Sequence, residues 1–393
     1  MKRDKKIFIT GATGFLGSNL IPKFIENGYG LKLLVRAKKD NPKSRLIQSL
    51  SNIYSDPLSI SNALDNIEVL EGDVIKRDFG LSENNLRFLS QEISDIFHCA
   101  AAVSFDEEKE NVVRKNNIEG TKNMLSFAEK IPNVHLHYMS TAYVCGQKSD
   151  MVKEKEVDLG QQFNNSYESS KCEAEILVRN WAAKCNSKVT IYRPSIIIGD
   201  SKTGKTQSNF GLYGILRIVD ITVRGFKSKY NKGHSEIRAG GAQFDDGNFY
   251  IPLRAIGRRE KTLNLVTIDY VSEVIMRIFK NKHNVGKTYH ITNSHPPTMG
   301  LLKDCICETL KVSGIKFVLP EVFAANPIKS WERLLNKNIH IYTPYLLLKE
   351  AFFDDTNTQE VLKNSHIRHA KLDRQLIMKL LAYSYPEKSA IMS

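Results

Sequence analysis

A tyrosine and a lysine four positions apart, Tyr167 and Lys171, lie in a stretch with the apolar spacing of a helix. Residues four apart share one face of a helix, so the phenol and the ammonium are expected to be neighbours. A nearby ammonium favours the phenolate and is expected to lower the pKa of the tyrosine. Such a tyrosine can exchange a proton with an oxygen whose carbon exchanges hydride. The spacing therefore predicts an acid–base pair.

Two hydroxyl residues, Ser140 and Thr141, follow a strand-like run at 134–139. A hydroxyl at the end of that strand can hydrogen-bond the same reacting oxygen as the tyrosine. The pattern thus predicts a second catalytic group on a different element. A tyrosine–lysine spacing is common by chance, and this neighbouring hydroxyl is one of the features that raise its specificity.

Three glycines, Gly11, Gly14 and Gly17, separate a strand-like run at 6–10 from a helical pattern at 16–27. Glycines in this position let the backbone approach a pyrophosphate, which is held at the N-terminus of the following helix. A glycine triplet between a strand and a helix predicts a dinucleotide site. The other cofactor-binding residues expected in this turn are Thr13, Phe15 and Leu16.

The residue after the second strand-like run is Arg36. Folds that prefer NAD usually carry an acid there, whereas a basic residue suits a 2′-phosphate, so NADP(H) is the predicted cofactor. Arg45 belongs to the same basic patch. After the next strands, Asp73 can meet the adenine, and the small residues Ala100 and Ala101 let the cofactor lie close to the backbone.

Positioning these groups requires alternating strands and helices, and the chain supplies them up to about residue 200. The strand-like runs are 6–10, 31–35, 66–70, 94–98, 134–139 and 188–192. The helical runs are 16–27, 43–52, 82–92, 111–130 and 167–184. This alternation predicts an α/β fold, a Rossmann-type doubly wound parallel sheet.

The alternation also predicts the domain organisation. The NADP-binding domain is expected to span 1–200, with the strand–helix–strand unit of 262–292 returning to it. Residues 201–261 and 293–393 are expected to form a smaller, mostly helical C-terminal substrate region.

The composition is that of an ordinary globular protein. The 393 residues are 41% hydrophobic and 25% charged, with no apolar run long enough to span a bilayer. Six cysteines without a CxxC pair suggest reduced thiols, and the basic N-terminal stretch is unlike a secretion signal, so a cytoplasmic location is expected. The net charge of +13 suggests anionic ligands, but no nucleic-acid-binding motif accompanies it, so no nucleic acid is expected as a partner.

A series of motifs resembles the extended short-chain dehydrogenase/reductases, and within them the branch of thioester reductase domains and fatty acyl-CoA reductases. The matching stretches, in chain order, are TGATGFLG, LLVR, EGDV, IFHCAAAVSF, NIEGT, STAYVCG, YESSK, YRPSIIIGDSKTG and LNLVTIDYV. They extend over roughly residues 5–292, which is more specific than any one motif.

The resemblance implies roles for individual residues. Thr141, Tyr167 and Lys171 would form the catalytic set, and Lys171 would also hold the nicotinamide ribose. Arg36 and Arg45 would meet the 2′-phosphate. The other residues implied along the cofactor are Val74, Asn117, Pro194, Ser195 and Ile196. No metal is implied.

The implied reaction is NADPH-dependent reduction of an acyl thioester to an aldehyde, or further to the alcohol. Because the fingerprint starts at residue 11, no adenylation or carrier module is expected before it, and the acyl group would come from acyl-CoA or an acyl carrier protein. Both are anionic, and residues 217–261 hold ten Lys/Arg against five Asp/Glu, so this segment is a candidate docking surface. A plain solvated surface is the alternative.

Other functions remain as alternatives. One is oxidation or epimerisation of a sugar nucleotide or a sterol-like alcohol, and another is an inactive NADP-binding sensor. Residues 199–206 satisfy GxxxxGK[ST], but the run follows Pro194 and a complete dinucleotide unit, so hydrolysis of ATP or GTP is disfavoured.

The apolar stretches 212–218 and 339–353 could line an acyl tunnel, although ordinary helix packing is the favoured interpretation. Residues 373–383 are amphipathic and leave peripheral membrane contact open, with a docked terminal helix favoured. Monomer and homodimer both remain open.

Overall fold

The computed structural model describes residues 6–37, 39–281 and 284–385, and the chain divides into two compact units. The first unit comprises residues up to 197 together with 266–293 and 351–369. The second unit comprises 198–265, 294–350 and the residues from 370 onward. The two are described separately below.

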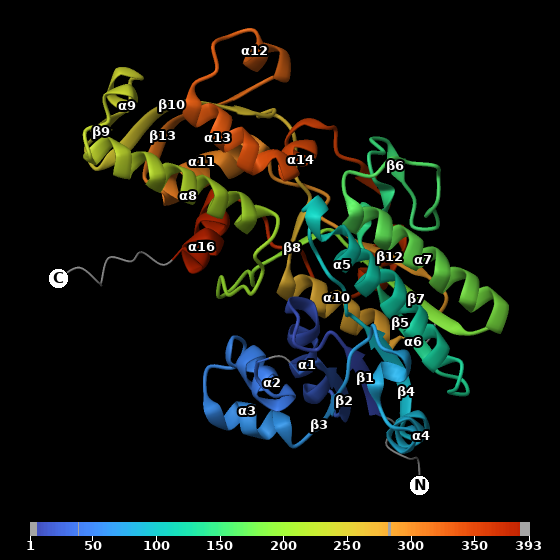
Figure 1. Cartoon of the computed structure of the whole chain (residues 1–393). Coiled ribbons are helices and arrows are strands. Elements are labelled where there is room, and N and C mark those ends of the chain that lie inside the picture. The colour runs from blue at the N-terminus through green and yellow to red at the C-terminus, as the bar shows by residue number, and fades with distance from the viewer. Residues whose placement is uncertain (1–5, 38, 282–283, 386–393) are drawn as a thin grey trace. The chain divides into compact units, whose positions relative to one another are not determined.

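The first unit contains a seven-stranded parallel sheet with the order β12-β7-β5-β4-β1-β2-β3 (Figure 1). Its strands are β1 (Lys6–Thr10), β2 (Leu31–Val35), β3 (Ile67–Glu71), β4 (Ile93–His98), β5 (His135–Met139), β7 (Lys188–Pro194) and β12 (Thr288–Ile291). The order reverses between β1 and β4, which is the doubly wound arrangement. The predicted Rossmann-type fold is therefore confirmed, and each predicted strand is found within about two residues.

Helices cover both faces of this sheet. One apolar core joins it to α1 (Phe15–Glu26), α2 (Pro42–Ser51), α10 (Ile268–Lys280) and α15 (Thr356–Leu362). The other core joins it to α4 (Glu83–Glu92), α6 (Gly120–Ala128) and α7 (Ser166–Cys185). Successive side chains of β1 show the division, because Ile7 and Ile9 belong to the first core and Phe8 to the second. The short α3 (Pro57–Leu64) was not predicted.

The predicted helix at 111–130 is interrupted. It consists of α5 (Glu110–Arg114), a π-helical segment (Lys115–Glu119) and α6. In the π-helical segment Asn117 is 1% exposed, and its amide exchanges hydrogen bonds with the backbone of Ala102 at 2.8 and 3.1 Å. Its Nδ2 also donates to Ser170 Oγ at 2.9 Å. The interruption thus lets Asn117 connect the loop after β4 to α7.

The structure differs from the predicted division at residues 351–369, which belong to the first unit and not to the substrate region. β14 (Phe352–Phe353) pairs with β6 (Met151–Val152), and α15 packs into the core of the sheet. The carboxylate of Glu154, 3% exposed, accepts from the backbone N–H groups of His290 and Asn357, each at 2.9 Å. Buried backbone donors need partners, so this carboxylate fixes the segment to β12.

The second unit has its own three-stranded sheet, β9 (Gln243–Asp245), β10 (Asn248–Ile256) and β13 (Val312–Val318), which the expectation of a mostly helical region did not include. β10 alternates buried and half-buried residues along its length. The longer helices of this unit are α8 (Leu212–Asn231), α11 (Met299–Thr309), α13 (Ser330–Ile339) and α16 (Arg374–Ser384). Its shorter elements are α9 (Ser235–Ala239), α12 (Pro320–Ala324) and α14 (Thr343–Leu347), and the small strands β8 (Ile196–Ile198) and β11 (Leu265–Thr267) lie where the chain passes between units.

The amphipathic stretch at 373–383 forms α16, which lies against α11. Its apolar residues Ile377, Leu380 and Leu381 are completely buried. The docked helix is therefore the better interpretation of this stretch. Among the described residues, no helix is long and apolar enough to cross a bilayer.

A buried ion pair fixes α7 to the sheet of the first unit. Glu175 on α7 and Arg193 on β7 are both 0% exposed, and two guanidinium nitrogens donate to the carboxylate at 2.6 and 3.0 Å. Ser140 Oγ donates to the same carboxylate at 2.6 Å. Burial alone would raise the pKa of Glu175, but the charge of Arg193 overrides it and holds the pKa below its usual range.

Glu175→Gln removes the carboxylate that the buried Arg193 contacts, whereas Arg193→Met leaves Glu175 a second cation, Arg179, whose guanidinium lies 2.8 Å away. We expect Glu175→Gln to lower the free energy of unfolding by about 3–5 kcal/mol, and Arg193→Met to lower it by less. Denaturant unfolding followed by far-ultraviolet circular dichroism would measure it. The exposed pair Arg114–Glu173 offers a control on the same helix, because Glu173→Gln should cost no more than about 1 kcal/mol. Equal losses at the two pairs would contradict the assignment.

Candidate active site

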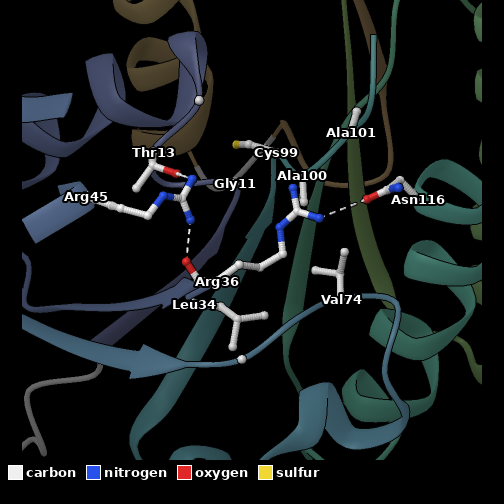
Figure 2. A pocket seen from close by; sticks show the side chains of 12 residues that line it. Gly11, Thr13, Leu34, Arg36, Arg45, Val74, Cys99, Ala100, Ala101 and Asn116 are labelled. Atoms are coloured by element: carbon white, nitrogen blue, oxygen red, sulfur yellow. Dashed lines mark hydrogen bonds between the residues drawn. The ribbon is translucent and has the colours of Figure 1, made fainter. Parts of the chain in front are cut away.

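A pocket of about 220 Å³ lies at the carboxyl ends of β1, β2, β3 and β4, where the strand order reverses (Figure 2). Open α/β sheets bind their ligands at this position. The predicted cofactor residues that line it are Gly11, Thr13, Gly14, Arg36, Arg45, Val74, Ala100 and Ala101. Four further lining residues were not predicted, namely Leu34, Gly72, Cys99 and Asn116.

The glycines of the first turn are required by close backbone contacts. Gly11 has a φ of +71°, and a Cβ on it would lie 2.6 Å from the backbone of Cys99 and Ala100. A Cβ on Gly17 would lie 2.3 Å from the carbonyl oxygen of Gly11. Gly14 is different, because its Cβ would meet only Gly11 O, at 3.1 Å, and would otherwise extend into the pocket. Gly11 and Gly17 therefore shape the turn, while Gly14 leaves space for a ligand.

Two arginines from different elements enter this pocket (Figure 2). Arg36 follows β2, and its guanidinium lies 3.5 Å from Asn116 Oδ1 and 3.7 Å from the Asp73 carboxylate. Arg45 on α2 hydrogen-bonds the backbone oxygen of Arg36 and the hydroxyl of Thr13, the latter at 3.4 Å. The two cations form a positive wall beside the glycine turn, which suits a phosphate. Asp73 contributes here as the partner of Arg36.

The remaining predicted cofactor residues lie outside the lining of this pocket. Phe15, Leu16 and Gly17 form the first turn of α1 behind it. Asn117 is buried, and its amide is occupied by the contacts described above. The last three, Pro194, Ser195 and Ile196, lie at the carboxyl end of β7 and the start of β8.

Ser195 offers a polar atom that a bound group could contact. Its residue is 5% exposed, and its buried Oγ has no hydrogen-bond partner within the part of the chain that the structure describes. A buried hydroxyl without a partner is costly, so it marks a place where a bound polar group fits.

The three predicted catalytic residues come from two neighbouring elements. Tyr167 lies in the first turn of α7, which begins at a cap formed by the Asn165 side chain, and Lys171 follows one turn later. Thr141 follows β5, and its hydroxyl lies within hydrogen-bonding reach of the Tyr167 phenol. The same hydroxyl is 3.4 Å from the carbonyl oxygen of Pro194. A phenol and a hydroxyl therefore face one another, and their catalytic role remains a prediction.

The ammonium of Lys171 lies deep in the first unit. The residue is 3% exposed, and its Nζ donates to Tyr138 Oη at 2.9 Å and to the carbonyl oxygen of Met139 at 2.7 Å. Burial lowers the pKa of Lys171 to about 8, against the opposing charge of Glu175. Lys171 is thus still mostly protonated at neutral pH.

The expectation that Lys171 lowers the pKa of Tyr167 is not met by this conformation. Burial raises the pKa of Tyr167 to about 12, and the hydrogen bond from Thr141 only partly opposes it. The ammonium instead donates its hydrogen bonds to Tyr138 and to the backbone at the end of β5. Tyr167 is accordingly a neutral phenol, able to donate a proton but not to abstract one.

The stretch 199–206, which matches a nucleotide-triphosphate loop, is a closed turn in the second unit. Asp200 Oδ1 accepts from the backbone N–H groups of Lys202 and Thr203 at 3.0 and 2.7 Å. The donors that would hold phosphates are therefore occupied by a carboxylate. The next helix, α8, starts only at Leu212. The geometry agrees with the sequence argument against hydrolysis of ATP or GTP.

Some of the basic residues of 217–261 are neutralised within the second unit. Arg224 pairs with Asp220, Arg254 with Glu332, and Arg259 with Asp304. Lys229 and Lys232 are exposed at the end of α8. The docking surface remains a prediction, and it depends on fewer cations than the count of basic residues in the sequence suggested.

Comparison with known proteins identifies the family. The family model described as "Male sterility protein" matches residues 9–275, which include the glycine turn, both arginines and all three predicted catalytic residues. The chain belongs to this family. Its domain is a nicotinamide-dinucleotide-binding domain of the extended short-chain dehydrogenase/reductase type, in agreement with the resemblance drawn from the motifs.

The relatives include "Nonribosomal peptide synthetase asaC" of Aspergillus flavus, 28% identical over 361 residues, which covers 88% of this chain and 31% of that protein. "Fatty acyl-CoA reductase wat" of Drosophila melanogaster is 27% identical over 252 residues, with 54% and 47% coverage. The chain thus spans less than half the length of these relatives. The solved terminal R domain of the myxalamid PKS-NRPS pathway has a TM-score of 0.74 at 24% identity, with 97% and 90% coverage, and shows the same fold.

The space in front of Gly14 gives a direct test of the pocket. We expect Gly14→Val to weaken dinucleotide binding at least about 10-fold, because its side chain would occupy the place of the phosphates. Titration with the reduced dinucleotide, followed by its fluorescence, would measure it. Gly225→Ala is the control, because a Cβ there meets no atom within 4 Å, and it should leave the affinity unchanged. An unaltered affinity in Gly14→Val would place the dinucleotide elsewhere.

Proposed function

We propose that the protein is an NADPH-dependent reductase that converts acyl thioesters to aldehydes. The observation that carries the proposal is the pairing of a hydroxyl and a neutral phenol, Thr141 and Tyr167, in a chain whose first unit also holds the dinucleotide pocket. Membership of the family supports it, since one of its relatives bears the name of a fatty acyl-CoA reductase. The alternative action on a sugar nucleotide or a sterol-like alcohol has no comparable support from these relatives.

The residues present fit the proposed cofactor. The glycine turn leaves room for phosphates, and Ser195 offers an unused buried hydroxyl. NADPH in preference to NADH is supported by Arg36 and Arg45, because a guanidinium binds a 2′-phosphate well and the position carries no acid for a ribose diol. When bound, the dinucleotide supplies the hydride that reduces the thioester carbonyl carbon.

The protein's own residues act on the carbonyl oxygen. Tyr167 and Thr141 donate hydrogen bonds to it, and such bonds to developing negative charge are a large catalytic contribution. Tyr167 then gives its proton to that oxygen. The carbon–sulfur bond of the resulting hemithioacetal breaks, so that the aldehyde and the thiol leave. Lys171, as an ammonium, binds the nicotinamide ribose, and a proton from water restores the Tyr167 phenol.

The acyl donor would be acyl-CoA or an acyl carrier protein. The exposed Lys229 and Lys232 are candidates for binding its anionic groups. The stretches proposed as an acyl tunnel do meet at one apolar cavity of the second unit, lined by Ile215, Val219, Ile339 and Leu346 among others. Its volume is about 30 Å³, which is too small to hold an acyl chain. Helix packing, and not a preformed tunnel, accounts for these residues.

The absorbance of NADPH, followed in the presence of acyl-CoAs from short to long, tests the proposal. We expect thioester-dependent loss of NADPH with release of one thiol per aldehyde, and a slower reaction with NADH. Tyr167→Phe should lower kcat by about 10²–10⁴-fold while leaving the affinity for NADPH unchanged. Full activity in Tyr167→Phe, or binding of NADPH with no reduction of any acyl-CoA or acyl carrier protein, would contradict the proposal.

The lowered pKa of Lys171 predicts how the rate depends on pH. Lys171 carries its charge below about pH 8 and loses it above, so kcat/KM should be level at neutral pH and fall as the pH rises beyond about 8. Lys171→Met should lower kcat/KM and abolish this decline. Lys184→Met, exposed at the end of the same helix, is the matched control and should keep the wild-type profile. A decline that persists in Lys171→Met would assign the pH dependence to another group.

A further inference from the structure

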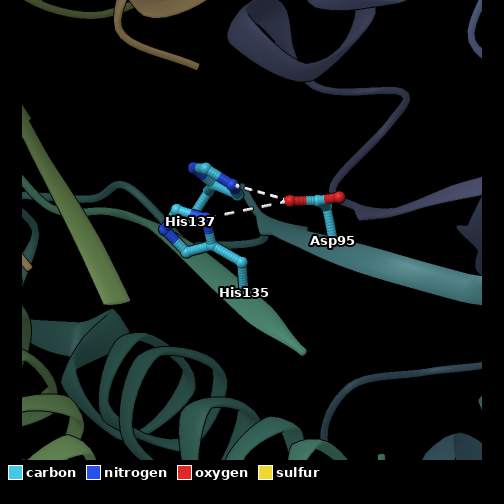
Figure 3. Close-up of side chains that lie close together, drawn as sticks. All are labelled: Asp95, His135 and His137. Atoms are coloured by element: carbon cyan, nitrogen blue, oxygen red, sulfur yellow. Dashed lines mark hydrogen bonds and ion pairs between the residues drawn. The ribbon is translucent and has the colours of Figure 1, made fainter. Parts of the chain in front are cut away.

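A histidine–aspartate cluster lies at the opposite end of the first unit's sheet from the pocket (Figure 3). Asp95 near the start of β4 is the register partner of His135 at the start of β5, and His137 follows on the same face. The side chains of Asp95 and His135 are 19% and 17% exposed, and that of His137 is 1% exposed. The cluster can thus be reached from solvent, but one member is fixed in the core.

Three atoms that could act as metal ligands, one from each side chain, converge in this cluster. Asp95 Oδ1 is 3.3 Å from His137 Nε2 and 3.9 Å from His135 Nδ1, and the donor atoms all lie within 4.8 Å of one another. Ligands about 2.0–2.2 Å from a tetrahedral zinc ion are themselves separated by about 3.3–3.6 Å. A small rotation of the half-exposed His135 ring is enough to close the remaining difference.

The atoms of these three side chains that face away from the cluster are each held by a hydroxyl. Asp95 Oδ2 accepts from the hydroxyl of Ser94 at 2.6 Å. His135 Nε2 lies 2.8 Å from the hydroxyl of Thr190, and His137 Nδ1 lies 2.9 Å from that of Tyr192. Partners of this kind orient metal ligands and select the tautomer of each histidine.

The tautomer of each histidine decides what lies between these atoms, because in one tautomer His137 Nε2 donates to Asp95 Oδ1 at 3.3 Å. If both imidazoles instead donate to their hydroxyl partners, His135 Nδ1 and His137 Nε2 turn lone pairs toward the Asp95 carboxylate. Three facing lone pairs repel one another unless a cation lies between them. Burial lowers the pKa of His135 to about 3, helped by the neighbouring His137, so its imidazole is neutral, which is the form that binds metals.

We propose that Asp95, His135 and His137 bind one divalent transition-metal ion, with zinc as the best match to two nitrogens and one oxygen. Water completes the coordination from the exposed side. The ion joins β4 to β5 at their amino ends and takes no part in hydride transfer. Asp95 is three residues before the last residue of β4, so at about 3.3 Å per residue the ion lies roughly 10 Å from the carboxyl end of the strand, where the pocket begins.

The 393-residue chain, stripped with a chelator and then titrated with ZnCl₂, tests the proposal. We expect one equivalent of zinc per chain by elemental analysis, and a rise of the unfolding temperature that saturates with zinc, because an ion that binds only the folded state stabilises it. The affinity for NADPH should stay within about twofold of its zinc-free value. Substitution of cobalt should give the visible bands of nitrogen and oxygen ligands without a thiolate charge-transfer band.

Variants at the cluster separate this site from others. Asp95→Asn and His135→Gln, both at partly exposed positions, should each weaken zinc binding by more than about 100-fold, whereas the exposed His366→Gln should bind zinc as the wild type does. Thr190→Val removes only the hydroxyl behind His135 and should weaken binding by about 10–100-fold with the stoichiometry unchanged. That graded loss would not follow from a merely structural role of the cluster.

Three results would overturn the proposal. One is the absence of stoichiometric zinc uptake by the wild type, which would mean that a proton on His137 occupies the space between it and Asp95. Another is undiminished uptake by Asp95→Asn and His135→Gln. The third is a thiolate band in the cobalt spectrum, which would assign the ion to a cysteine such as the exposed Cys185. The cobalt spectrum needs no variant, so the proposal stays testable even if the substituted chains fail to fold.

Discussion

The carboxylate of Glu175 and the guanidinium of Arg193 meet without any exposure to solvent, and the parts of the proposed catalytic site are arranged around them. Glu175 is one helical turn beyond Lys171, it accepts a hydrogen bond from Ser140 beside Thr141, and Arg193 precedes the strand end that carries Ser195. A single buried charge pair therefore connects α7, the end of β5 and the end of β7. Charges are costly to bury, so the pair is better understood as a device for positioning than as a source of net stability.

Much of the first unit could be predicted from the sequence because its strands are short apolar runs between polar or glycine-rich turns. The glycine turn, Arg36 and the Thr141–Tyr167–Lys171 set follow from the same logic, since each lies at the carboxyl end of a predicted strand or in the first turns of a helix. The partners of a buried cation are not encoded by spacing. Lys171 therefore could not be predicted to donate to Tyr138 and Met139 O instead of lowering the pKa of Tyr167.

The second unit was harder to predict for a physical reason. Its region 200–260 is rich in glycine, lysine and asparagine, which hides the nine-residue alternation of β10. β13 contains Gly314 with a φ of +87°, and its pairing with β10 shifts register between Tyr250 and Leu253, so the pattern of these strands is broken. Charge was equally misleading, because Arg224, Arg254 and Arg259 contribute to the basic count but are paired in the fold. Arg36 and Arg45, by contrast, line an open pocket.

The π-helical segment Lys115–Glu119 limits how the length of this chain can change during evolution. Asn116 lines the dinucleotide pocket, while the adjacent Asn117 turns inward to Ala102 and Ser170. Each residue of a helix advances by about 100°, so the loss of one residue here would restore a regular α-helix and rotate everything on one side of it by that angle. The two asparagines could then no longer keep both sets of contacts. Homologous chains should accordingly tolerate insertions and deletions in their surface loops but keep the residue count of this helix constant.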